Sequence, residues 1–401
     1  MMRVLIADKL STVAVDRLKD AGLSVEERPS VKGDELVAAL IETDPTILVV
    51  RSTRVEARHF QAASSLQLVV RAGAGVNTID LETASARAIV VSNCPGMNAA
   101  AVAELALAHI LNADRRIADC VHDLRLGRWQ KKIYANAPGL KGRTIGVIGC
   151  GAIGQAVIRR ALAFEMEVVA FDPALTDDQA KRLGVKPAPS VQDLAARCRI
   201  LTVHVPLNDY TRGLVNASVL AAMPDGSYVI NTSRGGIVDE AALADAVERR
   251  GFRAGLDVFC DEPGADGPWT NALASMSGVY GTHHIGASTQ QAQDAVAGEA
   301  ARVILHFAKF GDAPNCVNLL DKAAETHQIV VRHHDRVGVL ARVLEQLRMH
   351  RINVQGMDNV IYSGPQGAAC ARIRIEGPVP SDLGTRLNGL DDVIHVALVE
   401  I

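Results

Sequence analysis

The sequence predicts an α/β protein made of two parallel-sheet units, one inserted into the other, with a small third module at the C-terminal end. Short apolar runs alternate with helical patterns over most of the chain, which is typical of parallel βαβ construction. At 401 residues the chain is also too long for one hydrophobic core to keep growing. From residue 327 the order of elements changes to βαββαβ, which predicts a split βαβ module of the ferredoxin-like kind.

Buried strands of the first unit are expected at residues 4–7, 47–50, 68–71 and 89–92, and a long helical region follows at 99–127. The second unit has five expected strands, at residues 144–148, 167–171, 200–204, 227–231 and 254–257. A helix at 289–310 should return to the first unit, so that the second unit is an insertion. The third module should have strands at 328–332, 352–362, 368–376 and 393–400, and helices at 337–350 and 381–388.

These elements give the following predicted bounds: residues 1–96 with 289–316 for the first unit, 97–288 for the inserted unit, 317–326 for a linker and 327–401 for the last module.

Composition excludes several functional classes. A net charge of −3 argues against a nucleic-acid partner. The seven cysteines are scattered without a C-x-x-C pair, so neither a disulfide framework nor a metal site is expected. Residues 1–10 read as a strand rather than a signal peptide, and Glu104 and His109 interrupt the alanine-rich stretch at 99–111. We therefore expect a cytoplasmic protein without a membrane partner.

A glycine motif, G-C-G-A-I-G, directly follows the expected strand at 144–148. The first glycine, Gly149, allows the turn, Gly151 lets the backbone approach a pyrophosphate, and Gly154 permits close helix packing, with Ala152 and Ile153 opening the helix. A structural strand-to-helix turn is the alternative explanation of the glycines alone.

Asp172 lies at the end of the next expected strand, where a carboxylate accepts hydrogen bonds from ribose hydroxyls and repels a 2′-phosphate. A solvated turn residue is the alternative for Asp172 taken alone, but with the glycines it predicts a Rossmann-type unit that binds NAD.

Three charged residues, each just after an expected strand, suggest the chemistry. His284 is the candidate base for a hydroxyl proton, Glu262 can orient its ring and raise its pKa, and Arg234 can bridge a carboxylate and a carbonyl. Each residue alone could be a solvated loop charge. Together they predict hydride transfer at a hydroxyl-bearing carbon beside a carboxylate.

The chain resembles the D-isomer-specific 2-hydroxyacid dehydrogenases, and within them most the phosphoglycerate dehydrogenases. The segments that carry the resemblance are R-S-T-R-V (51–55), R-A-G-A-G-V-N-T-I-D (71–80), the glycine motif, N-T-S-R-G-G-I-V-D-E (231–240), G-L-D-V-F-C-D-E-P (255–263) and H-I-G-A-S-T (284–289). The resemblance implies a Rossmann-type NAD domain inserted in a flavodoxin-like substrate domain. It also implies oxidation of D-3-phosphoglycerate to 3-phosphohydroxypyruvate, the first step of serine biosynthesis. Two alternatives are a reductase of hydroxypyruvate, glyoxylate or another 2-keto acid, and an NAD-sensing binding protein.

The same resemblance assigns site residues. It makes Arg234, Glu262 and His284 catalytic, although His283 stands where the family has proline. It makes a further set bind substrate: Arg51 and Arg71 near a phosphate, the loop Ala72, Gly73, Ala74, Gly75 and Val76 through backbone N–H groups, and Asn98. Further cofactor contacts are implied for His204, Pro206, Thr232, Asp257 and Gly286.

The last module resembles an ACT domain through H-H-D-R-V-G-V-L (333–340) and R-I-N-V (351–354). This implies an effector site at His333, Asp335 and Asn353, with L-serine as the family's common ligand. Asp335 and Val337 depart from the family pattern, so a purely structural dimerising module is the alternative. The region of Trp129 is implied to pack between subunits, which predicts a homodimer or homotetramer.

Overall fold

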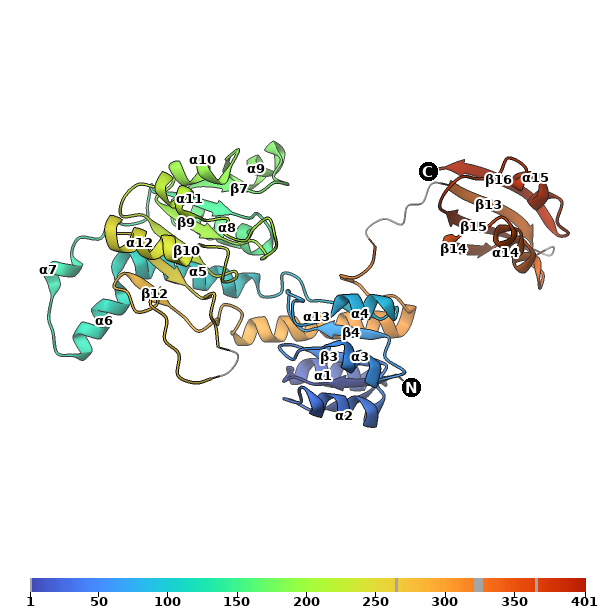
Figure 1. The fold of residues 1–401 in the computed structure, drawn as a ribbon, viewed down its shortest axis with the longest axis horizontal. Helices are drawn as coiled ribbons and strands as arrows, with labels where there is room; N and C mark the ends of the chain where they lie inside the picture. The colour runs from blue at the N-terminus through green and yellow to red at the C-terminus, as the bar shows by residue number, and fades with distance from the viewer. Residues whose placement is uncertain (1, 264–265, 321–326, 365–366) are drawn as a thin grey trace. The chain divides into compact units, whose positions relative to one another are not determined.

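The computed structural model describes residues 2–263, 266–320, 327–364 and 367–401 (Figure 1). The chain divides into two compact units, Met1–Asn318 and Leu319–Ile401. The larger unit contains two parallel sheets and the smaller one an antiparallel sheet, so the predicted α/β class is confirmed. No helix in the described ranges is long and apolar enough to cross a membrane.

The first parallel sheet has the strand order β2-β1-β3-β4-β5 of a flavodoxin-like unit. Its strands are β1 (Arg3–Ile6), β2 (Ser24–Glu27), β3 (Ile47–Val50), β4 (Leu68–Arg71) and β5 (Val90–Ser92). Helices α1 (Thr12–Asp20) and α13 (Gln290–Phe310) cover one face, and α2 (Asp34–Thr43), α3 (Ala57–Ala62) and α4 (Leu81–Ala86) cover the other. Helix α13 therefore returns to this sheet as predicted, after the inserted unit is complete.

The second sheet has the order β12-β11-β10-β9-β6-β7-β8, and all its strands are parallel. They are β6 (Thr144–Ile148), β7 (Glu167–Phe171), β8 (Lys186–Pro187), β9 (Ile200–Val203), β10 (Tyr228–Asn231), β11 (Arg253–Leu256) and β12 (Val279–Gly281). The chain direction across the sheet reverses between β6 and β9, and ligands of doubly wound folds bind at the carboxyl ends of strands at such a point.

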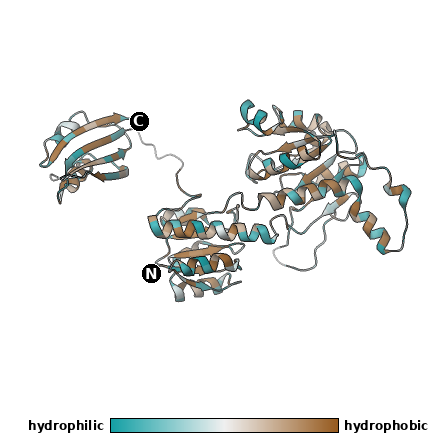
Figure 2. Cartoon of the chain, turned by 180° about the vertical axis from the view of Figure 1, so that it is seen from behind, coloured by the Kyte–Doolittle hydropathy of each residue, from teal (hydrophilic) through white to brown (hydrophobic). Residues whose placement is uncertain are grey.

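Helices pack on both faces of the second sheet. One face is covered by α5 (Ala99–Arg115), α8 (Ala152–Ala163) and α9 (Asp177–Leu183), and the other by α10 (Val191–Ala196), α11 (Ala217–Ala222) and α12 (Glu240–Arg250). Figure 2 shows hydrophobic residues along the strands and mixed colours on the helices. This is the pattern expected when strands are buried on both faces and helices on one.

The structure corrects the long helix expected at 99–127. It is two helices, α5 and α6 (Ile117–Arg125), separated at Arg116, which has a left-handed backbone with φ of 53°. A short helix, α7 (Lys131–Tyr134), follows. Strands β2, β8 and β12 were not predicted, because β2 is a polar edge strand and the other two are only two and three residues long.

Part of the predicted linker belongs to the larger unit. Val317 donates its N–H to the Val91 carbonyl, and Asn318 bonds to the backbone of Val91 and Ile89. Residues 321–326 of the linker lie outside the described residues. The other predicted domain bounds stay predictions.

The smaller unit is an antiparallel sheet of order β14-β15-β13-β16. Its elements are β13 (His327–His334), α14 (Val339–Met349), β14 (Val354–Ile361), β15 (Ala368–Ile375), α15 (Leu383–Asn388) and β16 (Val393–Glu400). Helices and sheet share a core that includes Ile329, Val343, Ile373 and Leu387. The predicted βαββαβ order is therefore confirmed.

Candidate active site

A cavity of about 1060 Å³ lies where loops from the carboxyl ends of both parallel sheets meet. The first sheet contributes the loop after β4, and the second contributes the glycine turn and the loops after β9, β10, β11 and β12. A Cβ at Gly75 would lie 2.8 Å from Nη2 of Arg234, so loops of the two sheets approach closely here. We call this cavity the cleft.

Unpartnered polar atoms gather in the cleft. Among the described residues, six buried side-chain N or O atoms have no hydrogen-bond partner, and four of these belong to residues that line the cleft. The four atoms are Arg71 Nε, Asn98 Oδ1, His204 Nδ1 and Thr232 Oγ1. Because buried polar groups are normally hydrogen-bonded, this concentration indicates a ligand site.

The glycine turn has the geometry that a dinucleotide requires. Gly149 has φ of 92°, which favours glycine, and a Cβ at Gly154 would collide with the Gly149 carbonyl oxygen. Gly151 has open space in front of it, and together with Ala152 and Ile153 at the start of α8 it lines the cleft. These residues fit NAD, because a helix N-terminus reached without an intervening side chain accepts a pyrophosphate.

Asp172 lies in a neighbouring cavity of about 430 Å³, and Gly151 lines both cavities. Its carboxylate accepts hydrogen bonds from the N–H groups of Cys150, at 2.8 Å, and Ala174, at 2.9 Å. Gln155 and Arg182 also line this cavity. The sequence did not mark them as site residues, because they belong to no motif with a recognisable spacing. Burial and then the Asp172 charge raise the pKa of Cys150 to about 11, so its thiol stays protonated.

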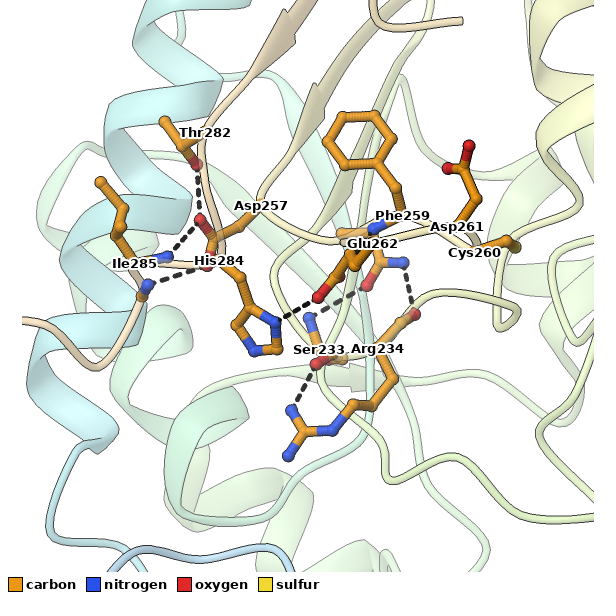
Figure 3. Close-up of polar contacts among 12 residues, drawn as sticks. Ser233, Arg234, Asp257, Phe259, Cys260, Asp261, Glu262, Thr282, His284 and Ile285 are labelled. Carbon is orange, nitrogen blue, oxygen red and sulfur yellow. Dashed lines mark hydrogen bonds and ion pairs between the residues drawn. The ribbon is translucent and has the colours of Figure 1, made fainter. Parts of the chain in front are cut away.

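His284 and Glu262 form a hydrogen-bonded pair at the cleft, as Figure 3 shows. His284 Nδ1 donates to Glu262 Oε2 at 2.7 Å, and the Phe259 N–H donates to Oε1 at 2.9 Å. The hydrogen bond to Glu262 raises the pKa of His284 against the opposing effect of burial. Burial raises the pKa of Glu262, but the hydrogen bonds from His284 and Phe259 outweigh it and leave that pKa below its ordinary value.

The segment that carries His284 is fixed by Asp257. The Asp257 carboxylate accepts from the N–H groups of Ile285 and Gly286, both at 2.8 Å, and from the Thr282 hydroxyl at 2.6 Å (Figure 3). His284 itself has φ of 53°, a left-handed backbone that costs a residue with a side chain about 1–2 kcal/mol. Such a conformation persists only when surrounding contacts determine it.

Three guanidinium groups come together near His284. Arg234 lines the cleft, Arg51 lines a cavity of about 400 Å³ beside it, and Arg71 and His284 line both. Burial lowers the pKa of Arg71, and the charges of Arg234 and Arg51 lower it further. Mutual repulsion of this kind is relieved by a bound anion. Lys9, Ser52 and Gln293 also line the second cavity and were missed, although Lys9 could have been found as a charge close after a parallel strand.

The loop 72–76 divides its N–H groups between two uses. Ala72 donates to the Val50 carbonyl and Gly73 to the Arg71 carbonyl, so both groups are used within the protein. In the described part of the chain the N–H groups of Ala74, Gly75 and Val76 have no such partner. Only these three are therefore free to meet a ligand.

The structure thus brings together most of the predicted site. The cleft is lined by Arg71, Ala74, Gly75, Asn98, Gly151, Ala152, Ile153, His204, Pro206, Thr232, Arg234, Asp257, His284 and Gly286. Glu262 lies behind His284, while Gly149 and Gly154 shape the turn from within. Burial lowers the pKa of His204 to about 3, so its ring is neutral.

The predicted effector residues lie in the smaller unit. His333 is buried, and its Nε2 lies 3.2 Å from Oδ1 of Asn359, a residue that the sequence did not single out. The Asp335 N–H donates to the Gly367 carbonyl, and Asn353 is exposed. Their role stays a prediction.

Comparisons with known proteins agree with this geometry. The family model described as D-isomer specific 2-hydroxyacid dehydrogenase, NAD binding domain, matches residues 107–286. A relative named D-3-phosphoglycerate dehydrogenase, from Archaeoglobus fulgidus, is 39% identical over 320 residues, which are 79% of this chain and 59% of that protein. The chain belongs to the D-isomer-specific 2-hydroxyacid dehydrogenase family.

Solved structures of similar proteins include one from Thermus thermophilus, with a TM-score of 0.69 and 32% identity, covering 79% of this chain and all of that one. Another is described as NAD+-bound 3-phosphoglycerate dehydrogenase of Entamoeba histolytica, with a TM-score of 0.65 and 25% identity, covering 80% of this chain and 99% of that one. As a member of this family, the present chain has an NAD-binding domain, which the family model matches at residues 107–286.

The glycine turn gives a prediction about stability. We expect Gly154→Ala to lower the free energy of unfolding by more than about 2 kcal/mol, because the added Cβ has to displace the Gly149 carbonyl. Gly298→Ala is the matched control. That glycine lies inside α13 with open space around it, so alanine should stabilise the helix by up to about 1 kcal/mol. Chemical denaturation measures both, and equal stability of the two variants would contradict the close packing described here.

Proposed function

We propose that the chain catalyses the NAD-dependent oxidation of D-3-phosphoglycerate to 3-phosphohydroxypyruvate, the first step of serine biosynthesis. The observation that carries the proposal is the placement of the His284–Glu262 pair beside the three guanidinium groups of Arg51, Arg71 and Arg234. The relatives named D-3-phosphoglycerate dehydrogenase, at 35–40% identity, support this choice of substrate. The chain spans only 58–66% of the length of these relatives.

His284 acts as the base in this proposal. Its Nδ1 is held by Glu262, which leaves Nε2 to accept the proton of the substrate hydroxyl. Glu262 stabilises the imidazolium that forms, and the same proton returns to the carbonyl oxygen in the reverse reaction. Gly151, Asp257 and Gly286, which line the cleft, would hold NAD, and NAD would supply the acceptor for the hydride.

The substrate is held at both ends. Arg234 and the free N–H groups of the loop 74–76 bind the carboxylate, and Arg234 also polarises the carbonyl of the keto acid. Arg51 and Arg71 bind the phosphate, a dianion that offsets their mutual repulsion. Asn98 lines both cavities and can orient the part of the substrate between them.

A wild-type assay separates this proposal from its two alternatives. We expect NADH oxidation with 3-phosphohydroxypyruvate to have a higher kcat/KM than with hydroxypyruvate, glyoxylate or 2-oxoglutarate, because only the first offers a phosphate to Arg51 and Arg71. Arg71→Gln should lower kcat/KM for the phosphorylated substrate by at least about tenfold, the size of one lost charge-assisted hydrogen bond. The same variant should change hydroxypyruvate turnover much less.

Lys186→Gln is the control for charge removal at a distance, since Lys186 pairs with Glu167 on the outer strands of the second sheet. Preference for an unphosphorylated acid would replace the proposed substrate by that acid. Binding of NADH without turnover of any acid would favour the NAD-sensing protein.

The ion pair gives a prediction about pH. Reduction of the keto acid needs protonated His284, so activity should fall as pH rises through the His284 pKa. That pKa is raised by Glu262, and Glu262→Gln should therefore move the fall to lower pH. The raised pKa also stabilises the fold below the unfolded-state value of about 6.5, and this stabilisation is lost as pH rises through the folded-state pKa.

Profiles of kcat/KM against pH for the wild type and Glu262→Gln measure the shift. Glu165→Gln serves as control, because Glu165 pairs with Lys141 on the surface. Identical profiles for all three proteins would show that Glu262 does not tune His284.

We also propose that the chain works as a homodimer or homotetramer. The segment around α6 and α7 exposes large apolar side chains, including Leu124, Trp129 and Ile133, with 81% of Trp129 exposed. An exposed patch of this kind fits contact with a second copy. The smaller unit is proposed to bind an amino-acid effector such as L-serine near His333, Asp335 and Asn353, or to serve dimerisation alone.

A further inference from the structure

A buried histidine behind the cleft is joined to the segment that carries His284. We infer that His109 is a positioning residue: through Thr282 and Asp257 it fixes the backbone of residues 282–286 and so aligns His284 with Glu262. This inference rests on the proposed function. His109 lies on α5, is 4% exposed and lines neither of the two cavities that meet at His284, so it acts only through other residues.

Close packing fixes the position of His109. A Cβ at Gly255, on strand β11, would lie 2.5 Å from the Cβ of His109 and 2.9 Å from its Cγ. Because position 255 is a glycine, helix α5 can pack directly on strand β11. The imidazole is held in this contact with little freedom to move.

The direction of the hydrogen bonds follows from their chemistry. The Thr282 hydroxyl has one proton, and it donates that proton to Asp257 Oδ1 at 2.6 Å. The 3.1 Å contact between His109 Nε2 and Thr282 Oγ1 therefore needs Nε2 to be the donor. Burial lowers the pKa of His109 against the opposing charge of Asp257, so the ring is neutral with its proton on Nε2.

Asp257 transmits this constraint to the segment. Its three donors, the Thr282 hydroxyl and the N–H groups of Ile285 and Gly286, lie on both sides of His284. His284 needs support from both sides because its backbone is left-handed. A Cβ at Gly286 would also lie 3.0 Å from Asp257 Oδ2, which shows how closely the segment approaches the carboxylate.

Loss of His109 should therefore act at two places. Without the Nε2 donor, Thr282 Oγ1 is no longer anchored to α5, and the segment that Asp257 holds loosens. His284 would lose its alignment with Glu262, which lowers kcat. Asp257 and Gly286, which line the cleft, would move as well, and this weakens NADH binding. The keto acid is held by Arg51, Arg71 and Arg234, so its KM should change little.

The test compares His109→Leu, His109→Gln and Thr282→Val in the 401-residue chain. Glutamine places an N–H donor at about the reach of Nε2 and should restore wild-type behaviour. Three quantities are measured: hydrogen exchange of the Ile285 and Gly286 amides without cofactor, NADH affinity by fluorescence, and kcat against KM for the keto acid. Ile110→Val, a neighbouring buried residue on α5, is the control for general loosening of the helix.

We expect His109→Leu to speed exchange of both amides at least about tenfold, to weaken NADH binding about threefold and to lower kcat about tenfold. Thr282→Val should have the same three effects. The double variant with His109→Leu should differ little from Thr282→Val alone, because both substitutions remove the same hydrogen bond between His109 and Thr282. Ile110→Val should leave all three quantities near wild type.

Wild-type exchange, affinity and kcat in His109→Leu would overturn the inference, and so would fully additive effects of the two substitutions. If His109→Leu does not fold, Thr282→Val alone must show the faster exchange, and normal exchange there overturns the inference too. If the wild type turns over no keto acid, the proposed function fails, while amide exchange and NADH affinity still decide the role of His109.

Discussion

The hydrogen bond between His284 and Glu262 is the interaction on which the proposed chemistry depends, and much of the surrounding structure serves to hold it. The two residues come from loops after different strands of the second sheet, and they meet only because parallel strands end at the same edge. Glu262 is held by the Phe259 N–H, and His284 is held in a left-handed backbone by Asp257. Rigid support of this kind keeps a proton acceptor aligned without help from the ligand.

The arginine side chains at the cleft repel one another. Three guanidinium groups lie near one another, and Arg71 is partly buried and repelled by the other two, with the Asp8 charge opposing this only in part. The fold tolerates this because Arg71 is held beside the loop backbone, where a Cβ at Gly73 would collide with its guanidinium. A bound anion would relieve this repulsion, which is why the proposed substrate is a phosphorylated acid.

Much of the site could be predicted from the sequence, because its residues follow recognisable strands. Gly149, Asp172 and Arg234 were predicted this way, and the structure places them at the carboxyl edge of the second sheet. Features that depend on packing or on local hydrogen bonding could not be found. The break at Arg116 does not alter the apolar pattern of the helix. The hydrogen bond from the Gly73 N–H to the Arg71 carbonyl depends on the loop conformation, which the sequence does not reveal.

His109 illustrates the same limit. In the sequence it only interrupts an alanine-rich helix, and its link to Thr282 appears when α5 is packed on Gly255. A residue distant in sequence and absent from the lining of the two cavities is thus hydrogen-bonded to the segment that carries His284. Periodicity identifies the face of a helix, but not the partner that a buried polar atom finds there.

Glu262 makes His284 a stronger base than an ordinary histidine. An NMR titration of the His284 ring measures this effect, with the signal assigned by its loss in His284→Asn, a substitution that the left-handed backbone tolerates. We expect a midpoint above the ordinary histidine value of about 6.5. A midpoint at or below that value would show that Glu262 does not raise the pKa of His284.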